Sequence, residues 1–198
     1  MADETGDTEV SHALLGWYRD QLTEAFEGTP THPALVAMAP SIKRHEISRE
    51  PMDDLITAFQ EDQQTTRYET WEQLLGYCSR SANPVGRIVL RMLGEEWSDH
   101  AQVRSDALCT ALQLTNHWQD LKGDLIDRDR IYIPGDMIDI PDFESRFRAT
   151  ARQGWSVDDT FLSDSRDLIK KCVERTWPLY AQGSELFPTL SRRSRPLV

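Results

Sequence analysis

Apolar side chains in this sequence recur at intervals of three and four residues, and this spacing constrains the fold more than any other feature. Between residues 10 and 26 they follow the i, i+3, i+4, i+7 pattern of a helix with one buried face, and Gly28 then ends the pattern. The alternation of apolar and polar residues that indicates strands is almost absent. The sequence therefore predicts an all-α bundle, and its 198 residues are enough for one domain, residues 1–198.

Local signals place the other helices. Thr70 and Gln73 have the spacing of a capping box, which predicts a helix from there to about residue 82. Asn83-Pro84 indicates either an N-cap followed by a first-turn proline or a kink. A variant of the capping box over residues 156–159 precedes the last predicted helix. The remaining predicted helices cover residues 34–44, a segment that begins near Pro51, 85–93, 104–125 and 160–180.

Composition excludes several classes of protein. The chain has 22 basic and 33 acidic residues, a net charge of −11, which opposes nucleic-acid binding by phosphate neutralisation. The cysteines Cys78, Cys109 and Cys172 form no CxxC pair, so neither a zinc ribbon nor a disulfide framework is indicated. Apolar runs stay shorter than the roughly 18 residues of a membrane span, and no export signal is present. We expect a cytoplasmic protein.

A line of polar side chains along the predicted helix 104–125 carries the strongest chemical signal. At about 100° per residue, four residues fall within roughly 80° of arc, on a different side from the apolar stripe. Because each residue rises 1.5 Å along the helix axis, successive members are at most about 6 Å apart along that axis. The four residues are Gln113, Asn116, Asp120 and Asp124.

Two interpretations of this line remain open from spacing alone. The first is a solvated acidic face, because charged helical faces usually contact only water. Against it, Asp120 and Asp124 repel each other at i, i+4, and Asp and Asn are mediocre helix formers. The second is a hard cation between the oxygens, since Mg²⁺ takes oxygen ligands and keeps waters and substrate phosphates in its shell.

A second polar cluster covers residues 59–68. Asp62 could complete a polar site and Arg67 could hold a phosphate or an acid, although an exposed, capped helix end explains the same residues. His117 lies beside the polar line, where a lone histidine is more often a polar filler of the core. The histidines form no HExxH pattern, and no P-loop or GxGxxG motif occurs, so a zinc hydrolase and a Rossmann cofactor site are not indicated.

Three segments resemble motifs of the squalene/phytoene synthase family. QLTNHWQDLKGD over residues 113–124, followed by RIYIP over 130–134, resembles the family's second aspartate-rich motif. RYETWEQLLGYC over 67–78 is similar to its RY-x₄-EL-x₂-YC segment, and RSANPVGR over 80–87 stands where the family has a VAGxVG-type sequence. The ANPVGR and NHWQD forms are most similar to the hydroxysqualene synthase branch of bacterial hopanoid biosynthesis.

The resemblance implies an isoprenoid synthase-type helical bundle around a central cavity. Two aspartate-rich motifs would face each other across it and bind Mg²⁺ and a diphosphate, with Asn116, Asp120 and Asp124 as the second motif. Gln113 and Tyr77 would line the pocket. The implied reaction ionises presqualene diphosphate, and water captures the rearranged cation as hydroxysqualene. The alternative within the family is a presqualene diphosphate, phytoene or dehydrosqualene synthase, which joins two prenyl diphosphates such as farnesyl diphosphate.

The chain departs from the family pattern at both ends. The opening Met1-Ala2-Asp3-Glu4 resembles the tail of the first aspartate-rich motif, with Asp3 as its last aspartate and metal ligand. We therefore expect an incomplete bundle, a fragment of the family's domain, and a non-catalytic helical remnant or scaffold is the second alternative. Because the substrates are lipids, the resemblance also implies peripheral contact with the inner membrane and association with other enzymes of the squalene pathway.

Overall fold

The computed structural model describes residues 8–153 and 158–197, and within these ranges it is all-α, as predicted. An isolated bridge between Arg67 and Ile131 is the only β pairing in this part of the chain. The helices are α1 (Thr8–Glu27), α2 (Pro33–Arg44), α3 (Glu50–Glu61), α4 (Trp71–Ser81), α5 (Asn83–Leu93), α6 (Asp99–Asp127), α7 (Phe143–Gln153) and α8 (Asp159–Ser184), with 3₁₀ turns η2 (Gly135–Met137), η3 (Phe187–Thr189) and η4 (Arg195–Leu197).

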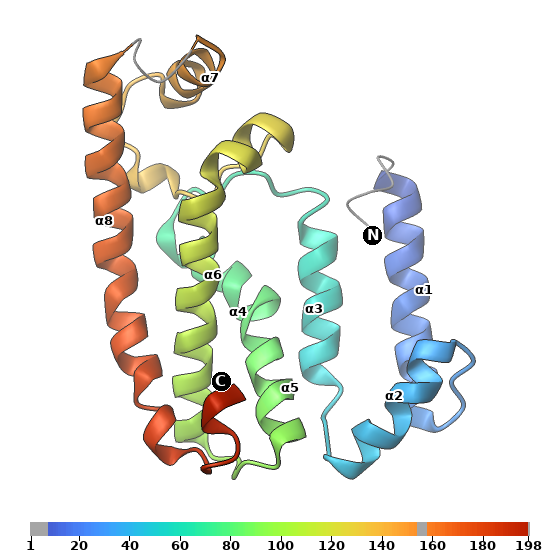
Figure 1. Ribbon diagram of the computed structural model, residues 1–198. Helices are drawn as coiled ribbons and strands as arrows, with labels where there is room; N and C mark the ends of the chain where they lie inside the picture. The colour runs from blue at the N-terminus through green and yellow to red at the C-terminus, as the bar shows by residue number, and fades with distance from the viewer. Residues whose placement is uncertain (1–7, 154–157, 198) are drawn as a thin grey trace.

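The long helices α8, α6, α3 and α1 stand side by side in a row, with α8 at one edge and α1 at the other (Figure 1). α8 packs on one side of α6 and α5 on the other; α3 then contacts α5, and α1 contacts α3. The short helix α4 packs against α3, α5 and α6, and α2 packs against α1. The helix that carries the predicted polar line, α6, thus lies between α8 and α5.

Three apolar clusters hold this arrangement, the smallest being Leu90 of α5 with Leu186 and Leu190. The largest one joins α4, α6, α7 and α8 to the segment 131–140, and its fully buried side chains include Leu74, Leu114 and Phe161. Across it, Trp118 Nε1 of α6 donates a buried hydrogen bond of 3.0 Å to Thr176 Oγ1 of α8. The second cluster joins α1, α2 and α3. The molecule thus has a tightly built half around α6 and a smaller core under α1.

Several local signals are confirmed. Gly28 follows α1 with a φ of +89°, a left-handed conformation that favours glycine and ends the helix. Thr70 is the N-cap of α4, and its hydroxyl accepts from the Gln73 amide at 3.2 Å. The Gln73 side chain accepts from the amide of Glu69, the residue before the cap, at 2.7 Å. The segment 131–134 is extended between helices, because Ile131 N donates to Thr66 O at 2.9 Å.

Two helix starts differ from the prediction. Asn83 is the first residue of α5 rather than its cap, because its side chain accepts a buried hydrogen bond of 2.8 Å from Thr110 on α6. α6 begins five residues earlier than expected, at Asp99, where the Ser98 hydroxyl accepts from Ala101 N at 3.2 Å. The cap of α8 is Asp158, which accepts from Phe161 N at 2.9 Å; residues 154–157, like Asp3, lie outside the described residues.

The described helices include none that combines the length and the apolar character needed to cross a membrane.

Candidate functional site

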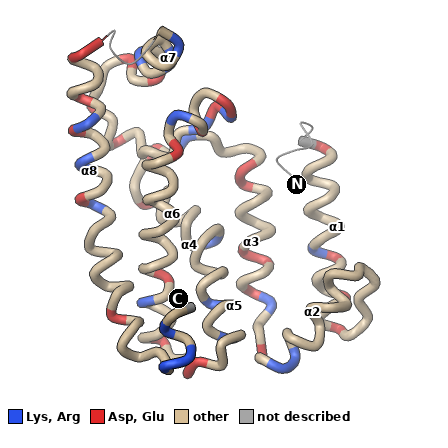
Figure 2. Tube along the Cα trace, viewed as in Figure 1, with Lys and Arg blue, Asp and Glu red and all other residues tan. Residues whose placement is uncertain are grey.

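The polar line of α6 runs from solvent into the interior. Asn116 and Asp120 are exposed, Gln113 is half-buried, and Asp124 is only 5% exposed. Figure 2 shows that charged residues gather at this C-terminal end of α6 and in the loop that follows it. The line therefore presents two accessible oxygen-bearing side chains in succession, followed by a carboxylate that is already enclosed by protein.

Asp124 is held in a partly apolar environment. Burial raises the pKa of its carboxyl, although Arg128 Nη1 donates to Asp124 Oδ1 at 3.2 Å and opposes the shift. The backbone oxygen of Asp124 accepts from Arg130 N at 2.8 Å, which turns the chain back toward the helix. A carboxylate in this position is stabilised by any further positive charge that approaches along α6.

Asp62 and Tyr77 meet beside this end of α6. Asp62 caps the C-terminus of α3, and Tyr77, 4% exposed, lies on α4. Burial first, then the Asp62 charge, with a hydrogen bond to the Asp62 carboxylate contributing as well, raise the pKa of the Tyr77 hydroxyl far above its ordinary range. Tyr77 is therefore a neutral phenol, and the structure brings together two residues that the sequence placed in separate motifs.

Three further residues complete this cluster, and sequence reasoning did not assign them to the site. The segments 66–69 and 131–136 pair through Gly135 N, which donates to Tyr68 O at 2.9 Å. This pairing stacks the Tyr68 and Tyr132 rings at a centroid distance of 5.8 Å. The His117 ring of α6 stacks on Tyr132 at 3.6 Å, with an interplanar angle of 12°. Neighbouring motifs contain all three, but only this long-range pairing brings them together.

Arg67, predicted to hold a phosphate or an acid, pairs with acidic side chains of the protein itself. Its Nε and Nη2 donate to the two carboxylate oxygens of Glu144, both at 2.8 Å, and Nη1 donates to Thr66 O and Asp129 O. Nη2 also pairs with the Asp129 carboxylate at 2.9 Å. Because each guanidinium nitrogen is engaged by protein, Arg67 joins the loop after α6 to α7, and we leave it out of the proposed site.

An apolar groove of about 590 Å³ lies between α1, α2 and α3. The α3 side is formed by residues spaced along one face of that helix, Met52, Leu55, Ile56 and Phe59, and Gln63 also lines the groove. Gln63 directly follows Asp62 in the sequence, so one lining residue of the groove is the neighbour of a member of the Asp62–Tyr77 pair. The groove has the chemistry of a hydrocarbon site.

The donors fit a hard cation only in part. Asn116 and Asp120 supply accessible oxygens from one helix, which suits Mg²⁺, an ion that usually takes one or two protein carboxylates and completes its shell with water and phosphate. Within residues 8–153 and 158–197, no three His, Cys, Asp or Glu side chains form a cluster that could hold a metal alone. Any cation here would therefore depend on a bound anionic ligand for the rest of its shell.

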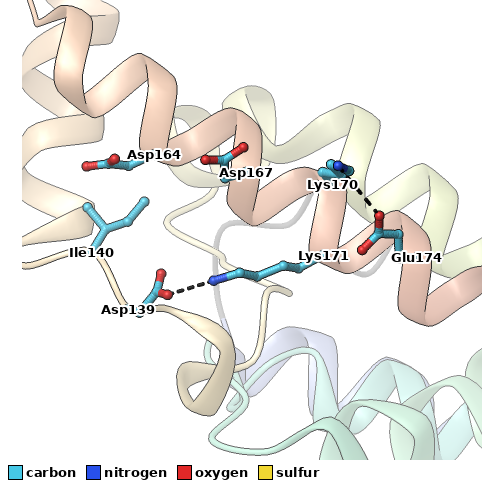
Figure 3. Close-up of a pocket in the computed structure, with 7 residues that line it drawn as sticks. All are labelled: Asp139, Ile140, Asp164, Asp167, Lys170, Lys171 and Glu174. Atoms are coloured by element: carbon cyan, nitrogen blue, oxygen red, sulfur yellow. Dashed lines mark hydrogen bonds and ion pairs between the residues drawn. The ribbon is translucent and has the colours of Figure 1, made fainter.

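A polar hollow of about 440 Å³ lies elsewhere, between residues 139–140 and α8 (Figure 3). Its basic side chains are paired with acids: Lys171 Nζ donates to Asp139 at 2.7 Å, and Lys170 lies 3.8 Å from Glu174. None of the predicted site residues borders this hollow.

Comparison with known proteins places the chain in a family. The squalene/phytoene synthase family model matches residues 1–198, and the chain therefore belongs to that family. A crystal structure of a squalene synthase from Alicyclobacillus acidocaldarius is similar with a TM-score of 0.80 and 34% identity, covering 94% of this chain and 67% of that one. The isoprenoid synthase-type bundle expected from the motifs is thus confirmed.

Two curated relatives differ in how similar they are to the chain. Hydroxysqualene synthase of Rhodopseudomonas palustris is 33% identical over 192 residues, which are 92% of this chain and 61% of that protein. Phytoene synthase 1 of Zea mays chloroplasts is 26% identical over 204 residues, which are 98% of this chain and 47% of that protein. The chain thus spans about half to three fifths of the length of these relatives.

Proposed function

We propose that the protein converts presqualene diphosphate to hydroxysqualene, with Mg²⁺ as cofactor. The observation that carries the proposal is the polar line of α6, which leads from the accessible Asn116 and Asp120 to Asp124. The neutral Tyr77 and its partner Asp62 lie beside the inner end of this line. A diphosphate bound along this line would have oxygen donors for its cation on one side and an aromatic hydroxyl at the reacting carbon.

The site residues have different roles in the proposed reaction, according to their chemistry. Mg²⁺, when bound, would neutralise the charge that develops on the leaving diphosphate. Asn116 and Asp120 would occupy the coordination positions of that ion that face the protein. The positive charge of the ion would also stabilise the Asp124 carboxylate. Tyr77 donates a proton in a hydrogen bond and keeps it, because its raised pKa excludes a phenolate at neutral pH.

The apolar groove supports a hydrocarbon substrate. It is lined almost wholly by aliphatic and aromatic side chains of α1, α2 and α3, and its lining residue Gln63 is next in the chain to Asp62. In the proposed reaction the carbon–oxygen bond to diphosphate breaks, the cation rearranges, and a water oxygen bonds to carbon. The proton that this water loses passes to the departing diphosphate or to solvent, so no reductant is needed.

The hydroxysqualene product is favoured over a joining reaction by sequence similarity. The hydroxysqualene synthase of Rhodopseudomonas palustris is 33% identical to this chain, against 26% for the phytoene synthase of Zea mays. Because substrate and product are lipids, we also propose peripheral contact with the cytoplasmic face of the membrane and association with the enzymes that supply and consume these lipids.

Product analysis of the purified chain tests the proposal. Presqualene diphosphate and farnesyl diphosphate are supplied separately with Mg²⁺, and released diphosphate and extracted C30 products are measured. We expect hydroxysqualene from presqualene diphosphate, loss of at least about 10²-fold in rate for Asp120→Asn, and an unchanged rate for Glu174→Gln, an exposed residue of α8 that borders the polar hollow. Conversion of farnesyl diphosphate alone to a C30 diphosphate, with presqualene diphosphate untouched, would overturn it.

A further inference from the structure

His117 has a polar atom that the fold buries without a partner. The residue lies on the same face of α6 as the polar line, four residues after Gln113 and three before Asp120. It is 6% exposed, and its Nε2 makes no hydrogen bond within the protein. A neutral imidazole has one N–H donor and one nitrogen with a lone pair, so Nε2 is a polar atom that a small ligand could satisfy.

The ring cannot turn away to find another partner. Tyr132 stacks on one face at 3.6 Å, and the Tyr77 ring lies 6.2 Å away. Stacking on Tyr132 fixes the plane of the imidazole, so its ring nitrogens stay within that plane at the contact between α6 and the segment 131–134.

Tyr68 has a second unpartnered polar atom in the same cluster. Its hydroxyl is buried and makes no hydrogen bond within the protein, while its ring lies 5.4 Å from Tyr77 and 5.8 Å from Tyr132. Tyr68 and His117 therefore flank the same two tyrosines. Leaving a buried donor or acceptor unpaired costs about 1–3 kcal/mol, whereas Phe and Leu would fill the same space without that cost.

We infer that His117 Nε2 and the Tyr68 hydroxyl hold the water molecule that adds to the carbocation in the proposed reaction. Water is a small ligand that can donate to an imidazole nitrogen and also exchange a hydrogen bond with a phenol. The inference rests on the proposed function, and it locates the water beside Tyr77 and one helical turn from Asp120. During capture the water oxygen bonds to carbon, and the proton it loses passes to the departing diphosphate or to solvent.

The test separates ionisation from capture in the complete chain. Wild type and His117→Phe are supplied with presqualene diphosphate and Mg²⁺ in water enriched in ¹⁸O, and released diphosphate and the C30 products are measured. We expect His117→Phe to release diphosphate at a rate within about tenfold of wild type. Its labelled hydroxysqualene should fall by at least about tenfold, replaced by C30 hydrocarbons formed when the cation loses a proton.

Matched variants keep the inference falsifiable. His117→Gln retains an acceptor and should keep the alcohol as the main product, while Tyr68→Phe should lower the alcohol fraction to a smaller extent. If His117→Phe is unfolded by circular dichroism, the product ratio of Tyr68→Phe decides. Hydroxysqualene as the main product of the folded His117→Phe, or an unchanged ratio in Tyr68→Phe, would overturn the inference. Failure of wild type to release diphosphate would instead overturn the proposed function.

Discussion

The helices α6 and α8 are packed much more closely than α1 and its neighbours. A Cβ added at Gly183 of α8 would lie 2.8 Å from the Leu108 backbone of α6, whereas one added at Gly16 of α1 would meet nothing within 4 Å. Helices α6 and α8 share the larger core, whereas α1, α2 and α3 share the smaller core and border the groove. The residues that need a fixed geometry thus lie in the close-packed half, and the apolar groove lies in the looser one.

Truncation of an aromatic side chain should give the largest difference in stability loss between the close-packed half and the looser half. Phe161→Ala removes a fully buried ring from the larger core and should lower the free energy of unfolding by about 3–5 kcal/mol. Phe59→Ala, at a groove residue that is 51% exposed, should lower it by less than about 1 kcal/mol. Urea unfolding followed by circular dichroism measures both. Equal losses would show that the groove side is packed as tightly as the α6 side.

Alanine at the two glycines should change stability in opposite directions. Gly183→Ala has to push α6 and α8 apart, because the contact is with Leu108 backbone, and we expect a loss of about 1–3 kcal/mol. Gly16→Ala adds a methyl group in open space inside a helix and should gain about 0.5–1 kcal/mol. Thermal unfolding of both variants tests this; stabilisation by Gly183→Ala would contradict the close contact.

Removal of the Arg67 side chain should weaken the close-packed half at its loop. Arg67→Met should cost about 1 kcal/mol, because the pair with Glu144 is bidentate but about a third exposed. The hydrogen bond from Arg67 lowers the pKa of Glu144. The stabilisation is therefore complete above the ordinary value of 4.5 and is lost as the pH falls through the lowered pKa. Unfolding of both proteins from pH 7 to pH 3 should show the difference shrink only in acid.

Asp124 should give the smallest effect on stability, with the opposite pH dependence. Burial raises the pKa of its carboxyl above the ordinary 3.8, so the charged form destabilises the folded protein at neutral pH. Asp124→Asn should therefore be slightly more stable than wild type at pH 7, and this advantage should disappear as the pH falls below 3.8. The same variant should lose activity with presqualene diphosphate. A variant less stable than wild type at pH 7 would show that the Arg128 contact outweighs burial.

The sequence predicts the bundle well because helix periodicity and caps are local properties. The cap at Thr70 and the stop at Gly28 both follow from residues within one turn. The cap predicted at Asn83 is wrong, because its side chain accepts from Thr110, 27 residues away. No local pattern indicates that Arg67 pairs with Glu144, 77 residues away.

The candidate site likewise has one part that the sequence predicts and another that it does not. The polar line of α6 follows from helical geometry, so its four members share a face as predicted. The cluster of His117 with Tyr68 and Tyr132 depends on pairing between residues 66–69 and 131–136, which no local pattern indicates.

Binding of inorganic diphosphate with Mg²⁺, measured by isothermal titration calorimetry, tests most directly whether the α6 line is a metal–diphosphate site. The account predicts that wild type binds diphosphate only when Mg²⁺ is present, that Glu174→Gln binds equally well, and that Asp120→Asn binds at least about tenfold more weakly with unchanged unfolding. Binding by Asp120→Asn with the affinity of wild type, or binding by wild type that does not depend on Mg²⁺, would contradict it.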